Sequence, residues 1–286
     1  MSDFNSSTFN MQSLGRSVLH MTDRDRRWIV MVRTFLLCVT LVFCASGAAL
    51  AHFGMVIPSA ATVDDKKEAA LNLTLSFSHP MELVGMPLVA PASFKVYLDG
   101  ESENLLATLK PATVMDHPAW TAGYAIKKPG VYQFVMEPAP YWEPAEDCFI
   151  IHYTKTCVAA FGEEEGWAEP LGLKTEIVPL TRPFGNYAGN VFQGVVLLDG
   201  KPVPGAEVEV ELYNRDGKYE APNDSMITQV VKADASGVFT YGVPFAGWWG
   251  FAALNTAKEK MDHEGTPKSV ELGAVLWTEF LEPRRK

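Results

Sequence analysis

Apolar and polar residues alternate one by one along much of this chain. Residues 71–77 read Leu-Asn-Leu-Thr-Leu-Ser-Phe, and residues 120–126 and 207–212 repeat the pattern. A period of two is typical of a strand with one buried face, because successive side chains point to opposite sides. In residues 207–212 we expect the valines and the leucine inside and the three glutamates outside. Beyond residue 51 no segment keeps a helical period for more than about two turns, and 19 Pro and 22 Gly interrupt the chain. The sequence therefore predicts an all-β fold.

The expected strands form two sets, separated by a Pro- and Gly-containing segment at residues 179–189. Short strands at this spacing favour a sandwich. We therefore predict two consecutive β-sandwich domains, immunoglobulin-like or prealbumin-like, at residues 52–182 and 188–280. The turn Asp-Ala-Ser-Gly at 234–237 is typical of sandwich modules of the carboxypeptidase-regulatory or prealbumin type, which we expect for the second domain.

Residues 1–51 have the organisation of a cleaved signal peptide. Arginines at positions 24, 26, 27 and 33 precede an apolar run that starts at Phe35, and Ala49-Leu50-Ala51 fits the small-x-small pattern of a cleavage site. The polar start makes Met21 or Met31 an alternative initiation site. An uncleaved anchor is the rival interpretation, since roughly 17 apolar residues are at the lower limit for a span. We predict export to the periplasm.

The charge of the chain argues against some partners. The 24 basic and 34 acidic residues become 19 and 31 when the leader's five Arg and three Asp leave, a net charge of −12. Such a surface is repelled by nucleic acid and by anionic membranes, so we expect neither as a partner. It is compatible with a cationic ligand.

Cleavage after Ala51 would make His52 the first residue of the mature chain. The free amine and the imidazole Nδ1 of a terminal histidine can close a six-membered chelate ring on one metal ion. An α-amine has a pKa of roughly 8, so a metal can displace its proton near neutrality. His52 is therefore the first candidate metal ligand.

Two more histidines are candidate ligands. His79 directly follows the strand expected at 71–77 and could meet the N-terminus at one pole of the sandwich, although a His before a Pro is often a turn residue. His152 is polar inside an apolar strand, and its alternative is a hydrogen-bonded core histidine. Nitrogen donors of this kind suit a borderline divalent ion such as Ni, Co, Cu or Zn. The second-tier candidates are Met55, Met81 and Glu82, and methionine at such positions is often packing.

The remaining reactive groups are less informative. His117 and His263 look like exposed loop residues. The loop at 141–147, Tyr-Trp-Glu-Pro-Ala-Glu-Asp, has three carboxylates that could gather cations or dock a partner, or simply be solvated. Cys148 and Cys157 would lie roughly 30 Å apart in one continuous strand, so the alternatives are a bridge across a hairpin or two buried free thiols. The chain has no nucleophile elbow, phosphate-binding loop, dinucleotide fingerprint or H-E-x-x-H.

Six segments, taken in chain order, carry a resemblance to a known family. They are Ala51–Met55, Ser78–Glu82, Tyr141–Asp147, Phe149–Lys155, Glu176–Leu180 and the Gly-Lys-Pro turn at 200–202. They resemble the nickel uptake transporter family, the periplasmic components of cobalt/nickel transport systems, and the resemblance covers essentially the whole mature chain. It implies an exported metal-binding protein beside an inner-membrane transporter, and only His52, His79 and His152 have both the resemblance and the chemistry behind them.

From residues and resemblance together we expect a periplasmic protein that binds Ni(II) or Co(II) and catalyses no reaction. Its expected partners are the metal cation and an inner-membrane metal transporter. One alternative is a Cu(II) protein with the same terminal chelate, either a carrier or a copper oxygenase acting on polysaccharide. The other is a sandwich module that binds protein or glycan without metal.

Overall fold

The computed structural model describes residues 52–285, and the signal-peptide prediction lies outside them. The described residues form strands and three single-turn 3-10 helices, with no α-helix among them. The all-β prediction is therefore confirmed. No helix within residues 52–285 has the length and apolarity needed to cross a membrane.

The strands are β1 (Phe53–Pro58), β2 (Thr62–Val63), β3 (Ala70–His79), β4 (Val84–Met86), β5 (Ser93–Leu98), β6 (Glu101–Asn104), β7 (Lys110–Val114), β8 (His117–Ala125), β9 (Gly130–Glu137), β10 (Tyr141–Glu143), β11 (Cys148–Ala160), β12 (Thr175–Pro179), β13 (Asn186–Tyr187), β14 (Val191–Leu198), β15 (Lys201–Pro202), β16 (Glu207–Leu212), β17 (Gln229–Lys232), β18 (Val238–Gly242), β19 (Gly247–Thr256), β20 (Met261–His263) and β21 (Thr266–Leu281). The 3-10 helices span Lys66–Glu68, Leu106–Thr108 and Asp224–Met226.

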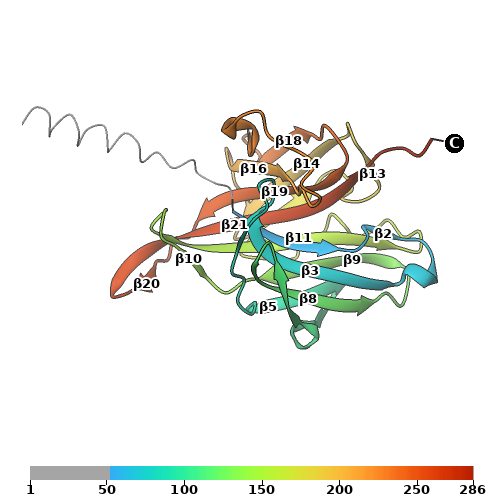
Figure 1. Cartoon of the computed structure of the whole chain (residues 1–286), viewed down its shortest axis with the longest axis horizontal. Coiled ribbons are helices and arrows are strands. Elements are labelled where there is room, and N and C mark those ends of the chain that lie inside the picture. The colour runs from blue at the N-terminus through green and yellow to red at the C-terminus, as the bar shows by residue number, and fades with distance from the viewer. Residues whose placement is uncertain (1–51, 286) are drawn as a thin grey trace, which may run out of the picture. The chain divides into compact units, whose positions relative to one another are not determined.

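The strands form three sheets that build two sandwich halves (Figure 1). A twelve-stranded sheet has the path β17-β16-β19-β21-β11-β9-β5-β6. A five-stranded sheet with the path β1-β3-β8-β7 packs on the β11-β9-β5 part of it. A four-stranded sheet with the path β12-β14-β15 packs on the β16-β19-β21 part. The prediction of consecutive β-sandwiches is confirmed.

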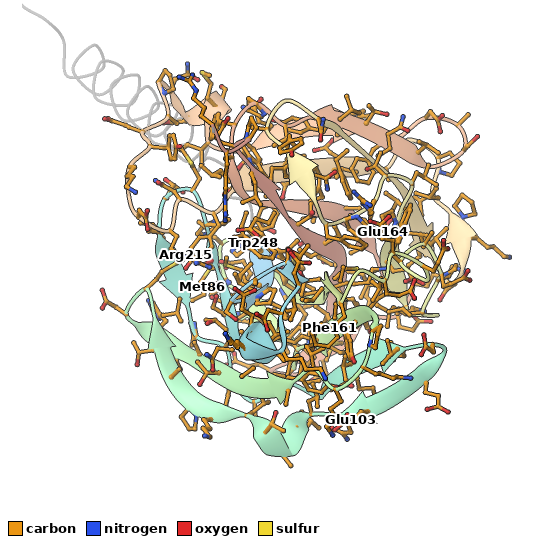
Figure 2. All side chains as sticks on the ribbon, turned by 90° about the vertical axis from the view of Figure 1, so that its right-hand side faces the viewer. Met86, Glu103, Phe161, Glu164, Arg215 and Trp248 are labelled. Carbon is orange, nitrogen blue, oxygen red and sulfur yellow. The ribbon has the colours of Figure 1, made fainter. Side chains whose placement is uncertain are left out.

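Each half has a core that follows from its alternating strands. In the first half the leucines and Phe77 of β3 point inward and meet aromatic residues of β5 and β9, such as Phe94 and Phe134. In the second half Val208, Val210 and Leu212 of β16 are buried as expected. Figure 2 shows the space between the ribbons filled with side chains.

Tight turns set the register of the hairpins. Asp99 and Gly100 join β5 to β6 with φ values of 52° and 79°, and Asp199 and Gly200 join β14 to β15 with 51° and 69°. Positive φ at both central residues is the requirement of the two-residue hairpin turn, and Asp-Gly satisfies it at the lowest cost.

β11 and β21 join the two halves. They pair in parallel from Cys148↔Ser269 to Thr156↔Trp277, while β9 pairs with β11 and β19 pairs with β21. One sheet therefore runs through both halves, and all described residues belong to one compact unit. Sequence analysis puts residues 175–179 in the first half, but β12 pairs with β14 of the second. Independent folding of residues 188–280 stays a prediction.

β1 lies across this junction. Phe53 contacts Trp277 edge-on with ring centroids 5.7 Å apart, and the Trp277 Nε1–H donates to the Gly54 carbonyl at 2.8 Å. Both rings belong to a third core cluster, with members from both halves, that includes Met55, Ile57 and Trp248. Within the described residues, the first strand, β1, is therefore held in place by the last strand, β21.

Gly54 permits this close approach. A Cβ built on Gly54 would lie 2.3 Å from Oγ1 of Thr154 and 3.1 Å from Cβ of His152. The only ways to fit it are to shift β1 or to turn the Thr154 side chain, whose hydroxyl donates to the His152 carbonyl.

We predict that Gly54→Ala lowers the free energy of unfolding by about 1–3 kcal/mol, the usual cost of overpacking a core. The control is Gly123→Ala in β8, where a Cβ would meet nothing within 4 Å and the change should be small. Urea unfolding of both variants measures the difference. Equal stability of the two variants would contradict the packing described here.

Candidate functional site

The three candidate histidines come together at one end of β1. His52 immediately precedes β1, His79 ends β3, and β1 pairs with β3 from Phe53↔Ser78 onward, so His52 and His79 are side by side. Their ring centroids are 4.7 Å apart. His152 comes from β11, on which β1 lies. All three side chains are buried.

Phe77 contacts two of the imidazoles. Its ring stacks on His52 and meets the edge of His152, with centroid distances of 5.7 Å in both cases. Burial, followed by the charges of His79 and His152, lowers the pKa of His52 to about 4, against a smaller raising effect of Glu143. His52 is therefore neutral at pH 7.

The hydrogen bonds of His52 select one tautomer. Its Nε2 is 3.0 Å from Oε2 of Glu143, and because a carboxylate only accepts, this nitrogen carries the proton. Nδ1 of the neutral ring then carries no proton and has a free lone pair. This nitrogen lies 3.9 Å from Oε1 of Glu146. Glu143 is held in place by the Ala145 backbone N–H, which donates to its other oxygen.

His152 has a partner at each ring nitrogen. The Gly54 backbone N–H donates to its Nδ1 at 3.4 Å, and its Nε2 is 3.2 Å from Oε1 of Glu271. A Cβ on Gly273 would lie 2.3 Å from the ring, so glycine on β21 makes room for it. In the structure His152 is a hydrogen-bonded core histidine, which is the alternative to metal ligation given in the sequence analysis.

Carboxylates and one thiol surround the imidazoles. Burial raises the pKa of Glu146, and the charges of Glu271 and Glu143 raise it further. Burial and the same three carboxylates raise the pKa of Cys148 to about 12. Glu143 and Glu146 of the acidic loop approach His52, and Glu271 approaches His152, so both sets of carboxylates face the same site.

The turn after His79 is held by the second half of the chain. The Asn214 backbone N–H donates to the Pro80 carbonyl at 3.2 Å, and its side-chain amide donates to the Met81 carbonyl at 3.1 Å. The Met81 N–H donates to Oε2 of Glu211 at 3.2 Å. Both halves therefore position this site.

The other sequence candidates lie elsewhere. Met55 is in the core and accepts from the Ser78 hydroxyl, Met81 packs against the second core, and Glu82 is exposed. His263 stacks on Trp142 with ring centroids 3.7 Å apart.

Cys148 and Cys157 lie in the single strand β11 as free, buried thiols, one of the two alternatives considered.

Sequence reasoning missed Glu271, which no pattern places near the histidines. It named Glu143 and Glu146 as part of an acidic loop that could gather cations, without assigning either to the histidine site. Glu211 was expected on the solvent side of β16, yet it is buried beneath the turn after His79. The pattern of β16 gave no sign that the Glu211 end of its polar face is covered, while Glu207 is exposed as expected.

Within residues 52–285, no three His, Cys, Asp or Glu side chains are already arranged to hold a metal ion. The α-amine that sequence analysis assigns to the chelate would arise only by cleavage before His52, and the cleavage site lies outside the described residues.

Comparison with known proteins identifies the family. The model of the "Domain of unknown function (DUF4198)" matches residues 49–257. The chain belongs to this family. No curated protein matches the chain.

Some solved structures have a distant likeness to this DUF4198 chain. The D0-D1 domain of intimin has 12% identity over 81% of this chain and 100% of that one, with a TM-score of 0.22. The fibronectin(III)-like modules of Clostridium thermocellum CbhA have 12% identity, coverages of 81% and 98% and a TM-score of 0.18. A putative carbohydrate binding protein from Bacteroides uniformis has 9% identity, coverages of 79% and 98% and a TM-score of 0.22. These likenesses carry no information about what the chain does.

The titration of Glu211 should make the free energy of unfolding depend on pH. Burial raises its pKa to about 7, although the Thr228 hydroxyl and the Met81 N–H stabilise the charged form. Because the folded pKa exceeds the unfolded value near 4.5, this group's stabilising effect is full below pH 4.5 and lost as pH rises through 7.

We predict that the stability of the wild type relative to Glu211→Gln falls by about 3 kcal/mol between pH 4 and pH 8. Thr228→Val removes a hydrogen bond that lowers the pKa and should move the fall to higher pH. Urea unfolding at stepped pH provides the measurement. A difference between wild type and Glu211→Gln that is flat across this range would refute the assignment.

Proposed function

We propose that this protein is a periplasmic binding protein for a transition-metal cation, Ni(II) or Co(II), that supports its uptake by an inner-membrane transporter. The observation that carries the proposal is the hydrogen bond between Nε2 of His52 and Glu143, with the His79 ring 4.7 Å away. The choice of metal and the transporter partner rest on the resemblance of the sequence to the nickel uptake transporter family.

The tautomer of His52 is the one that the terminal chelate needs. An amine and a side chain of the same histidine close a six-membered ring only through Nδ1, which must have a free lone pair. A proton held on Nε2 by Glu143 leaves that lone pair free. A carboxylate behind a ligating histidine commonly fixes the tautomer and orientation of the ring.

The lowered pKa of His52 supports the same role. The His52 ring is neutral at pH 7 and need not lose a proton before it binds metal, whereas the α-amine of the same residue must lose one near neutrality. Affinity should therefore fall as the pH is lowered from about 8 to 6.

His152 can act as a ligand by exchanging one hydrogen bond. Its Nδ1 accepts from the Gly54 N–H at 3.4 Å, the longer of its two contacts. In this proposal the metal takes the place of the Gly54 N–H at Nδ1, and Nε2 keeps its hydrogen bond to Glu271.

Negative charge around the rings favours a cation over a neutral ligand. Glu143, Glu146 and Glu271 bring three carboxyl groups to the three imidazoles, and burial weakens their screening by solvent. Glu146, near Nδ1 of His52, is a fourth candidate ligand.

We predict that protein starting at His52 binds Ni(II) and Co(II), and that one extra residue before His52 weakens binding at least about tenfold by removing the free amine from the chelate. His79→Ala and Glu143→Ala should each weaken it about tenfold to a hundredfold, the usual effect of losing a ligand or its orienting carboxylate. The measurement is calorimetric titration of correctly processed protein.

Two variants are matched controls for these losses. His117→Ala removes an imidazole from the β7–β8 hairpin and Glu101→Ala removes an exposed carboxylate from β6, and both should keep wild-type affinity. Unchanged affinity in the extended protein would eliminate the terminal chelate. Metal analysis of periplasmic protein purified without added metal tests the metal, since copper would favour the copper alternative.

A further inference from the structure

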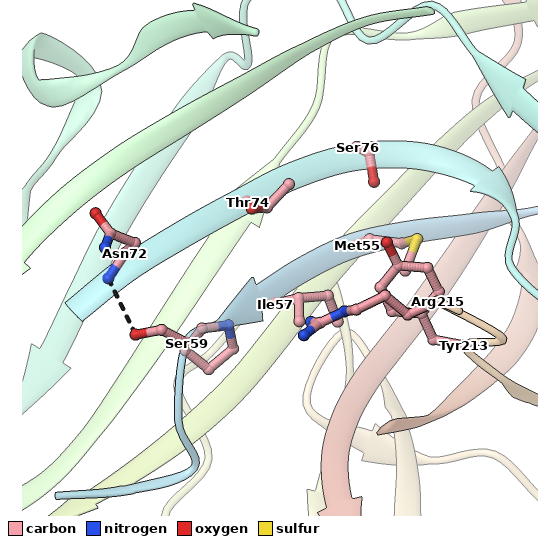
Figure 3. Close-up of a pocket in the computed structure, with 9 residues that line it drawn as sticks. Met55, Ile57, Ser59, Asn72, Thr74, Ser76, Tyr213 and Arg215 are labelled. Atoms are coloured by element: carbon pink, nitrogen blue, oxygen red, sulfur yellow. Dashed lines mark hydrogen bonds between the residues drawn. The ribbon is translucent and has the colours of Figure 1, made fainter. Parts of the chain in front are cut away.

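A groove on the outer face of the five-stranded sheet is separate from the histidine site. It lies over β1 and β3 and is closed on one side by the segment after β16 (Figure 3). Its volume of about 260 Å³ is just below the range of about 300–1,000 Å³ found for drug-sized ligands. It has room for one small molecule.

One wall of the groove is a row of hydrogen-bonding side chains. Asn72, Thr74 and Ser76 are alternate residues of β3, so they share the face opposite the buried leucines. Figure 3 shows them spaced along the strand. Thr74 is half-buried and Ser76 is buried, although a fully solvated polar face would leave both exposed.

The floor of the groove is apolar. Met55 and Ile57 of β1 pair with Ser76 and Thr74 in the sheet and lie on the same face. They belong to the core cluster at the junction of the two halves, and the groove opens where the cover of that cluster ends.

A single cation completes the groove. Arg215 and Tyr213 form the far wall, with the guanidinium carbon 5.3 Å from the centre of the tyrosine ring. In the described part of the chain Arg215 forms no ion pair, and its neighbour Asp216 pairs with Lys218 instead. The Tyr213 N–H donates to the Trp248 carbonyl, which fixes the start of this segment.

We propose that this groove binds a small hydroxycarboxylate, such as a sugar acid. A guanidinium pairs with a carboxylate through two parallel hydrogen bonds. Hydroxyl and amide groups at alternate positions of a strand are roughly 7 Å apart, so they suit hydroxyls that are several carbons apart on such a ligand. The ring of Tyr213 and the small exposed part of Ile57 contact its carbon skeleton, while Met55 is fully buried and supports the floor from below.

The test is calorimetric titration of the full chain, without metal, using three probes of similar length. D-Gluconate has the carboxylate and the hydroxyls, the open-chain polyol D-glucitol lacks the carboxylate, and hexanoate lacks the hydroxyls. Gluconate should bind most tightly. Metal-free protein makes the result independent of the metal proposal, and His79→Ala should bind gluconate like the wild type.

Single substitutions separate the contribution of the arginine from that of the hydroxyl groups. Arg215→Ala should weaken gluconate binding about tenfold or more, the usual size of a lost charged hydrogen bond. Thr74→Val should weaken gluconate but leave hexanoate unchanged. Lys218→Ala removes the same charge from the same loop outside the groove and should have little effect. The proposal would be overturned if gluconate bound no more tightly than D-glucitol, if Arg215→Ala left gluconate affinity unchanged, or if inorganic phosphate bound equally tightly.

Discussion

The structure depends on how closely β1 approaches the central sheet. Gly54 brings the β1 backbone against Thr154 and His152, and its carbonyl accepts from the indole of Trp277. This contact fixes the first strand of the described chain on its last. Because His52 directly precedes β1, the same contact determines where the proposed N-terminal ligand lies.

The strands were largely predictable, because the alternation of apolar and polar residues can be recognised within a single short segment. The alternation in residues 71–77 and 207–212 gave both the strands and their buried faces. The convergence of His52 and His79 followed from a simple rule, that strand ends in a sandwich gather at its poles. Neither conclusion needed knowledge of which sheet a strand joins.

What could not be predicted is pairing between distant segments. Nothing in the sequence near β11 says that it pairs with β21 more than a hundred residues later. Glu271 therefore could not be placed beside His152, nor Asn214 beside the turn after His79. For the same reason Glu211 was expected in solvent, since covering a polar strand face is a tertiary property.

Burial and charge act together at the histidine site. Loss of solvent keeps His52 neutral, and its contact with Glu143 selects the tautomer that leaves Nδ1 available. The carboxylates of Glu143, Glu146 and Glu271 beside the histidine rings give a site whose negative charge a divalent cation would offset. The C-terminal half contributes Glu271 and the support for His79, so the site belongs to the whole fold.

The central claim is that His52, His79 and His152 bind one metal ion together. X-ray absorption at the nickel edge, on protein that begins at His52 and carries one Ni(II), tests it most directly. The account predicts a shell of nitrogen and oxygen donors with outer scattering from several imidazoles and no sulfur. A shell without imidazole scattering, or one with a sulfur ligand from Cys148, would contradict it.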